Sequence, residues 1–243
     1  GYCATHALLA GAVCVLTTEK LAEPERDQAL LLRSALVMNI GMARPQDSLA
    51  RQAGPINDWQ RALVAEHPAR SAQILRAFGV DDAHQLDMVR WHHVPESEEA
   101  SPTSQTSRRL LHLADVFVAR TAARRTRSAQ APVAAVKSMV FGAGGGDLGL
   151  GSAMAQAVGF YPPGSYVKLV NGEIAVAVQR GERANTPWVI SIVGNDAMPL
   201  ARYQCKSTAE PRDAISAPVN FASVKVGISA EKVRKARERI PVP

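Results

Sequence analysis

Apolar residues recur at helical spacing through most of the first 160 residues. The stretch 4–19 is apolar almost throughout, and 25–39 places its apolar residues three and four positions apart. Pro24 suits the first turn of this second helix, and Gly41 followed by Pro45 predicts its end. This part of the chain therefore predicts a bundle of helices.

Further helices are expected along the same part of the chain. Asn57 is a candidate N-cap for a helix that begins at Asp58. Pro68 is expected to end this helix and to separate it from another helix over 69–76. A polar stretch rich in Ser, Glu, Thr and Pro predicts a loop over 95–106. A long helix is expected through 110–117.

The pattern changes after residue 160. Residues 165–178 favour two strands around Asn171-Gly172, a strong hairpin signal, and 188–193 is a third strand. Beyond residue 200 only a short basic helix over 229–239 can be predicted. We expect a mainly α chain with three parts: a helical bundle (1–160), a small antiparallel β unit (161–200), and a tail with a short C-terminal helix (201–243).

Composition narrows the class of protein. The chain has 243 residues and 47% hydrophobic content, which is typical of a globular protein. Its apolar runs are shorter than the roughly 20 residues that a membrane span needs. Three cysteines without metal-ligand spacing favour a reduced, cytoplasmic setting.

The formal net charge of +6 is unevenly distributed. Arginines gather around Asp115 and basic residues gather near the C-terminus. Such clusters are either solvated helix faces or sites for phosphate anions. Specific DNA or RNA binding is not favoured, because the chain shows no recognised nucleic-acid-binding motif.

Scattered histidines are the candidate chemistry. His6, His67, the pair His92-His93 and Asp115 lie on separate helical stretches that a bundle can bring together. Imidazole and carboxylate are common metal ligands. These five residues could hold one divalent ion (Fe, Mn or Zn), or form a hydrogen-bonded cluster without metal. In either case a buried Asp115 needs a partner, for which His67, His92 or an arginine is expected.

The segment between His6 and His67 reads Met38-Asn39-Ile40-Gly41-Met42. In this order of parts the chain resembles the HD-GYP family, whose members hydrolyse cyclic di-GMP in bacterial signalling. There the segment reads His-Asp-Ile-Gly-Lys, and a Gly-Tyr-Pro motif follows the double histidine. That motif is absent from 94–103 here. The resemblance covers about the first two thirds of the chain, and the β unit is similar to an appendage of some members.

The resemblance implies an HD-type bundle with a degenerate site. Asn39 replaces the acid that would bridge two metal ions, Met38 replaces a histidine ligand, and Met42 removes an ammonium group. Arg124 and Arg127 match basic positions that hold the ligand's phosphates. We expect a catalytically impaired regulator that binds cyclic di-GMP or a protein partner such as a diguanylate cyclase domain. The alternative is a metal-dependent phosphohydrolase with an altered or residual metal site.

Overall fold

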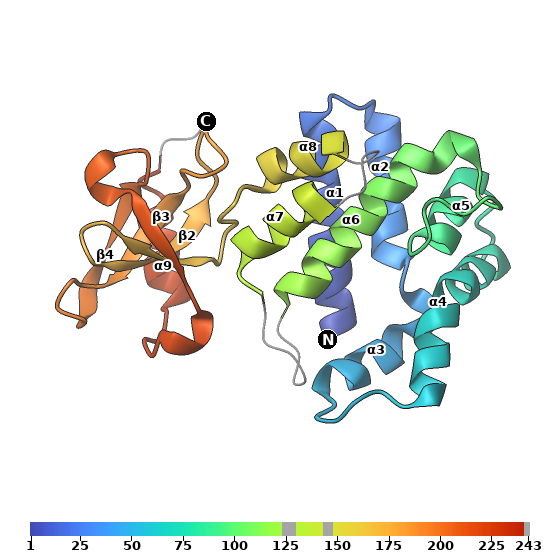
Figure 1. Ribbon diagram of the computed structural model, residues 1–243, viewed down its shortest axis with the longest axis horizontal. Helices are drawn as coiled ribbons and strands as arrows, with labels where there is room; N and C mark the ends of the chain where they lie inside the picture. The colour runs from blue at the N-terminus through green and yellow to red at the C-terminus, as the bar shows by residue number, and fades with distance from the viewer. Residues whose placement is uncertain (123–129, 143–147, 241–243) are drawn as a thin grey trace. The chain divides into compact units, whose positions relative to one another are not determined.

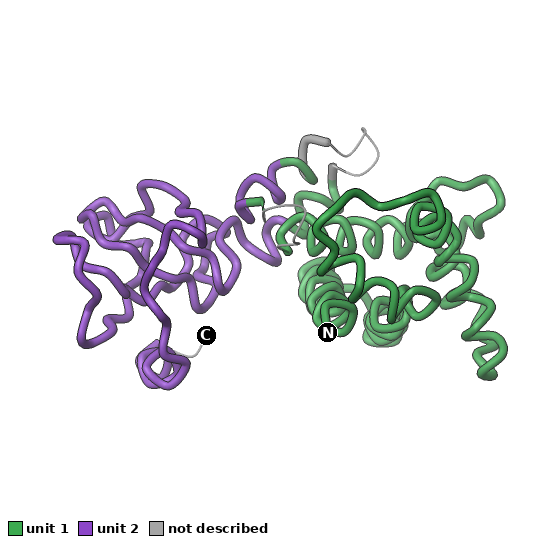
Figure 2. The backbone as a smooth tube through the Cα atoms, turned by 90° about the horizontal axis from the view of Figure 1, so that it is seen from below, with its two compact units in different colours: residues 1–130, 138–154 green, residues 131–137, 155–243 purple. Residues whose placement is uncertain are grey.

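The computed structural model describes residues 1–122, 130–142 and 148–240. By its internal contacts the chain divides into two compact units: residues 1–130 with 138–154, and residues 131–137 with 155–243 (Figure 2). The described chain is mainly α-helical, and an antiparallel sheet and a short C-terminal helix follow the helices. This layout confirms the predicted fold class. The boundaries predicted at residues 160 and 200 stay predictions.

The first unit is a bundle of helices (Figure 1). In α1 the buried residues include Ala10 and Cys14, which share a core with Leu31 of α2 and Leu111 of α6. None of the helices in the described ranges is long and apolar enough to cross a membrane. The helices of this unit are α1 (Tyr2–Lys20), α2 (Glu25–Val37), α3 (Ala43–Arg51), α4 (Asp58–Ala77), α5 (Ala83–Trp91) and α6 (Gln105–Thr121), while α7 (Pro132–Gly142) and α8 (Leu148–Val158) each have residues in both units.

Asn57 caps α4 as predicted. Its side-chain oxygen accepts a hydrogen bond from the backbone N–H of Gln60. The side-chain oxygen of Gln60 in turn accepts from the backbone N–H of Asn57. The predicted division at Pro68 is wrong, because α4 continues through the proline to Ala77. Pro45 lies in the first turn of α3, where a missing N–H costs nothing.

The segment Met38–Met42 packs closely against α4. Ile40–Met42 forms a short 3-10 turn, and the backbone N–H of Gly41 donates to Ser71 Oγ at 3.0 Å. A Cβ on Gly41 would lie 2.8 Å from the carbonyl oxygen of His67. Glycine is therefore needed here for close approach, and this contact holds the segment beside the α4 histidine.

The second unit contains a five-stranded antiparallel sheet, in the order β4-β3-β2-β1-β5, among the residues that the structure describes. The predicted hairpin joins β1 (Tyr166–Leu169) to β2 (Ile174–Gln179), and Gly172 adopts φ 90° in its turn. The predicted third strand is β3 (Trp188–Val193). Two further strands, β4 (Pro199–Ser207) and β5 (Ile215–Val219), were not expected from the sequence.

Both faces of this sheet are covered. Ala236 and Ile240, from α9 (Ala230–Arg237) and the residues after it, pack on the face that carries Val176 and Ile190. The other face carries a smaller cluster around Val167, Leu169 and Val189, against which Tyr161 packs. Burial on both faces explains why β2 and β3 are continuous apolar runs rather than alternating ones.

A partly buried ionic network connects β3 and β4 to the turn between β1 and β2 and to the turn before β5. Lys206 on β4 donates to Glu173 at 2.6 Å and lies 3.3 Å from Asp213. Ser191 on β3 also donates to Glu173, at 2.5 Å. Burial would raise the pKa of Glu173, but the bonds from Lys206 and Ser191 outweigh it and lower that pKa.

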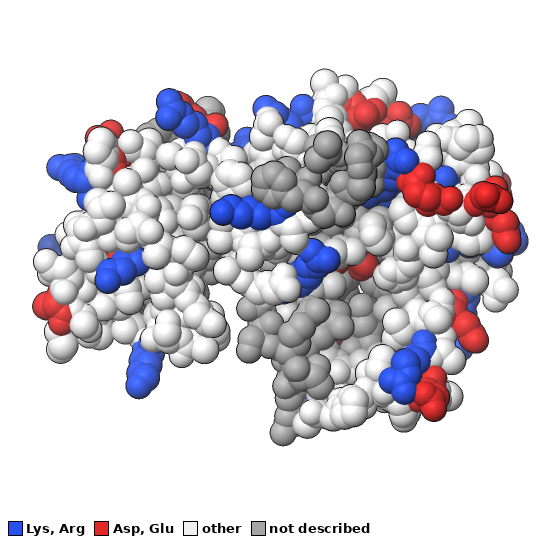
Figure 3. Space-filling view, viewed as in Figure 1, with Lys and Arg blue, Asp and Glu red and all other residues white. Residues whose placement is uncertain are grey.

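The surface charge does not gather into one basic patch on the face drawn in Figure 3. Lysine and arginine side chains stand there singly or beside acidic ones. Exposed ion pairs of the described chain include Arg61 with Asp58 and Lys235 with Glu231. This arrangement agrees with solvated helix faces more than with a polyanion track.

Candidate metal centre

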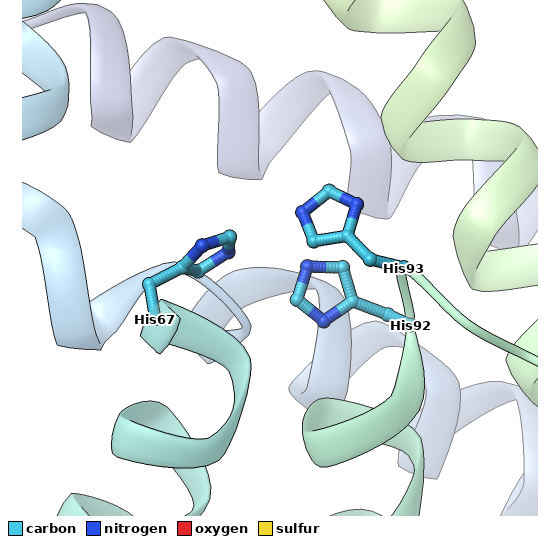
Figure 4. Close-up of side chains that lie close together, drawn as sticks. All are labelled: His67, His92 and His93. Atoms are coloured by element: carbon cyan, nitrogen blue, oxygen red, sulfur yellow. The ribbon is translucent and has the colours of Figure 1, made fainter. Parts of the chain in front are cut away.

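Three histidines come together where α4 passes the end of α5. Their possible ligand atoms, one from each of His67, His92 and His93, all lie within 4.8 Å of one another. In Figure 4, His67 approaches from one helix and the adjacent pair from the other. The ring centroids are 4.2 Å apart for His92 and His93, and 5.0 Å for His67 and His93. The bundle thus assembles three of the five predicted ligands at one point.

Pro68 fixes the tautomer of His67. A proline at this position has no N–H to donate to the carbonyl of Val64, four residues earlier. His67 Nδ1 lies 2.7 Å from that oxygen and donates to it instead. The proton is therefore held on Nδ1, and the buried Nε2 has no hydrogen-bond partner among the described residues. A histidine that donates one N–H to a carbonyl presents its other nitrogen as a metal ligand.

The end of α5 does the same for His92. Carbonyls in the last turn of a helix lack backbone donors. His92 Nδ1 donates to one of them, the Val89 oxygen, at 2.8 Å, and its buried Nε2 is also without a partner among the described residues. The carbonyl of His92 is in turn bonded by His112 Nδ1 of α6, at 2.7 Å. Two helices thus fix the position of this ring.

Burial keeps the rings neutral. It lowers the pKa of His67 to about 4 and that of His92 to about 3. The pKa of His93 is lowered for the same reason, although this side chain is 38% exposed. Neutral imidazole is the form that binds metal. The cluster is therefore ready for a cation near neutral pH.

Asp115 lies beside the cluster and is bonded to His6. His6 Nε2 is 2.7 Å from one carboxylate oxygen, and His93 Nδ1 is 3.9 Å from the other. Burial would raise the pKa of Asp115, but the bond from His6 and nearby histidines hold it well below its usual range. The partner is thus His6 rather than the His67, His92 or arginine expected from the sequence.

A cavity of about 210 Å³ adjoins this pair. It is lined by His6, Asp115 and His93, together with Met42 and Gln46. Gln46 is buried, and its Oε1 has no partner among the described residues. Met42 thus stands at the cavity wall, where an ammonium group would have faced the same space.

The two residues before Ile40 are fully enclosed. Met38 is buried, and Asn39 is 4% exposed with neither its Oδ1 nor its Nδ2 hydrogen-bonded within the described part of the chain. An unsatisfied buried amide costs free energy, so this position is under strain unless a ligand or water meets it. Arg124 and Arg127 lie outside the described residues.

The donor set fits one metal ion better than two. His67 and His92 would hold it through their free Nε2 atoms, with His93 as the third ligand, while Asp115 lies outside this group of three, with one oxygen 3.9 Å from His93 Nδ1. Two nitrogens bound at about 2.1 Å can be at most about 4.2 Å apart, so a shared ion would draw the rings slightly together. A second ion would need a bridging carboxylate, and Asn39 is neutral.

Sequence reasoning missed the residues that support this cluster. His112, Gln46 and Ser71 were not predicted. His112 had a signal, since it precedes Asp115 by three positions on one helix and so shares its face. Gln46 and Ser71 had none, because polar residues on helices are common.

The fold and the cluster together define a class: helical proteins whose helices gather histidines that could hold a metal ion. Within it, the chain is similar to a curated Pseudomonas aeruginosa protein named as a cyclic di-GMP phosphodiesterase. The two are 27% identical over 188 residues, which cover 73% of this chain and 45% of that relative. The chain thus spans under half of the relative's length. The likeness supports the HD-GYP resemblance at a distance.

No family model matches the chain. No solved structure matches it either.

Proposed function

We propose that this chain is a cyclic di-GMP signalling domain of the bacterial cytoplasm whose hydrolytic site is impaired. It acts by binding cyclic di-GMP or a protein partner such as a diguanylate cyclase domain. The observation that carries the proposal is Asn39, a buried neutral amide in the segment that packs against α4 beside His67. The distant likeness to a cyclic di-GMP phosphodiesterase supports the choice of ligand.

The loss of charge explains the impairment. When bound, a divalent ion supplies positive charge to a phosphate oxygen and makes bound water more acidic. Efficient phosphodiester hydrolysis in such sites commonly uses two ions, held together by a shared carboxylate. Asn39 is nearly the size of aspartate but has no charge to bridge them. Met38 offers only a thioether, which suits soft metals rather than iron or manganese.

The remaining residues favour binding over turnover. His67 and His92 are neutral and oriented, and Asp115 stays negative because His6 holds it. These groups can hold a cation, which in turn attracts a phosphate. Met42 brings no positive charge to the cavity wall, so a reacting phosphate would lack that stabilisation. Arg124 and Arg127 stay candidate phosphate ligands.

A second candidate function rests on the two histidine nitrogens without a partner among the described residues, Nε2 of His67 and of His92, and on His93 beside them. A single ion on His67, His92 and His93 can by itself activate a water molecule, as mononuclear hydrolases do. The domain would then be a slow metal-dependent phosphohydrolase. The two functions differ in turnover rather than in ligand.

The test combines metal content, binding and hydrolysis on the same preparation. We expect close to one Fe, Mn or Zn per chain by elemental mass spectrometry, and loss of that metal when His92 and His93 are both changed to Ala. His84→Ala, an exposed histidine outside the cluster, is the matched control and should keep the metal. Calorimetry should show cyclic di-GMP binding with no linear product formed.

Restoring the missing ligands should restore turnover. We expect the Met38→His, Asn39→Asp double variant to hydrolyse cyclic di-GMP at least ~100-fold faster than the natural chain, the usual effect of one catalytic group. Metal-dependent hydrolysis of cyclic di-GMP by the unmodified chain, even if slow, would support the phosphohydrolase instead. A chain that binds neither metal nor cyclic di-GMP would refute the phosphohydrolase and the cyclic di-GMP-binding regulator.

A further inference from the structure

Helix α1 has a mainly apolar outer side as well as a mainly apolar inner side, which is unusual for a helix at a domain surface. Its inner side is buried against α2 and α6 and carries His6. Its outer side is also apolar: Leu8 is 64% exposed and Leu16 is 42% exposed. A helix that is hydrophobic all round is normally buried all round. Nothing in the described chain covers this outer side, and Figure 2 shows the N-terminal end of α1 at the edge of its unit.

The outer side has an ordered pattern. Ala4, Leu8, Ala12 and Leu16 are all exposed and spaced four apart, so they form one ridge along the helix. Small and large side chains alternate along it. Leu9 adds to the apolar face, at 49% exposure. Helix α2 packs beside α1 at Gly11. A Cβ added to Gly11 would touch the side chain of Leu32 and approach that of Leu36, both on α2.

This alternation is self-complementary under a two-fold rotation. If two antiparallel copies of α1 cross near residue 10, Leu8 of one copy faces Ala12 of the other. Leu16 of one copy then faces Ala4 of the other. Each large side chain meets a small one, which is how ridges of i, i+4 residues interlock at a crossing of about −50°. A two-fold contact uses the same surface on both copies, so one such surface is sufficient.

We propose that a second copy of this chain packs on the outer face of α1, with this ridge at its centre. Charge does not oppose the contact: the sequence from Gly1 to Thr18 has no Asp, Glu, Lys or Arg, and the exposed charged residues of α2 balance one another (Glu25, Arg26, Asp27 and Arg33). From helix length and diameter, the combined outer faces of α1 and α2 cover roughly 500 Å². A standard stable interface buries about 800 Å² per partner. The pair is therefore a dimer that dissociates on dilution.

The test is sedimentation velocity of the full chain over a range of concentrations. We expect a shift with concentration from 26.0 kDa to twice that mass. Ala12→Leu places a large side chain opposite Leu8 and should weaken the dimer roughly tenfold or more. Combining Leu8→Ala with Ala12→Leu restores a small residue opposite each large one, so dimerisation should return. Phe78→Ala, at an 81% exposed position on α4, is the control and should leave the dimer unchanged.

Each other outcome overturns the proposal. A chain that stays monomeric at every concentration has this face free or covered by another partner. If Ala12→Leu strengthens association, the contact is non-specific apolar attraction. If the swapped double variant fails to recover while circular dichroism shows a folded chain, the two-fold pairing is wrong. None of these results bears on metal or cyclic di-GMP binding, so the proposed function is tested separately.

Discussion

His67 and His92 both use a backbone carbonyl that has no backbone donor. The Val64 carbonyl is left by Pro68, and the Val89 carbonyl lies in the last turn of α5. The protons are therefore fixed before any ligand arrives. A site prepared in this way loses less entropy when it binds a cation.

The metal-free chain should lose stability as the pH falls below about 6.5. The folded pKa values of His67 and His92, about 4 and about 3, lie below the ordinary value for histidine. At a pH between the folded pKa and the ordinary histidine pKa, these rings are protonated in the unfolded chain but neutral in the folded chain. Lowering the pH through this range therefore favours unfolding. Each ring should contribute up to about 1.4 kcal/mol per pH unit there and nothing above it.

Urea unfolding with a chelator from pH 4 to 8 measures this dependence. His92→Asn should make it shallower, because the amide can donate to Val89 but does not titrate. Asp115 does not contribute to this pH dependence in the measured range. Its pKa is lowered in the folded chain, so the stability that its negative charge provides is lost only in stronger acid. Equal slopes for both proteins would mean that His92 titrates normally when folded.

The ligands themselves could be predicted from the sequence, but their geometry could not. Histidine and aspartate are few and chemically distinctive, so His67, His92 and His93 stand out. The pairing of His6 with Asp115 joins residues 109 positions apart and depends on how α1 crosses α6. Such pairings follow from packing, which a single sequence does not show.

Among the elements, the short turn at Ile40–Met42 is the most tightly constrained. Gly41 lies against the His67 carbonyl and the backbone of Ser71. Gly41→Ala would bring its Cβ within 2.8 Å of that carbonyl oxygen, so either α4 or the turn must shift. We expect a loss of about 1–3 kcal/mol in the free energy of unfolding, together with weaker metal binding.

Gly54→Ala provides the comparison, because a Cβ there meets nothing within 4 Å. Thermal unfolding of both variants should show a clear drop for residue 41 and little change for residue 54. If Gly41→Ala leaves the free energy of unfolding unchanged, this contact is loose and does not position His67.

The prediction for α4 failed for a physical reason. Proline usually ends or kinks a helix because it leaves a carbonyl unpaired and crowds the preceding turn. Here the side chain of His67 takes the freed carbonyl, and the helix continues. The sequence shows the His-Pro pair but not that the histidine turns back to compensate.

At the scale of the whole molecule, two units carry different stabilising groups. The second depends on Lys206, which is 14% exposed in its side chain and lies between Glu173 and Asp213. Lys206→Met would leave Glu173 without its cation and Asp213 with only the exposed Arg212. We expect a loss of about 3–5 kcal/mol in the stability of this unit.

The metal content of the first unit should not change in that variant. Lys235→Met, which breaks an exposed pair with Glu231, should cost less than about 1 kcal/mol and is the control. Hydrogen exchange resolves the two units. If Lys206→Met lowers the protection of amide hydrogens from exchange in the helices as well as in the sheet, the destabilisation is not confined to the second unit.

The general architecture was predictable, but the size of the sheet was not. The Asn-Gly turn and the apolar runs on both sides predicted β1 and β2. In contrast, β4 is an edge strand with mostly exposed or half-buried residues, and β5 carries Pro218. Edge strands tolerate polar residues and proline, so they lack the pattern that identifies a central strand.

Pro68 has a consequence for how this sequence can change. Helix stability alone favours almost any other residue at position 68, because its backbone N–H would donate the missing helical hydrogen bond to the Val64 carbonyl. Such a replacement would compete with the His67 ring for the Val64 oxygen and release the imidazole to rotate and exchange tautomers. Random mutation selected only for heat resistance would therefore tend to erase the site. Retention of proline in a diverging lineage would indicate that the cluster is still in use.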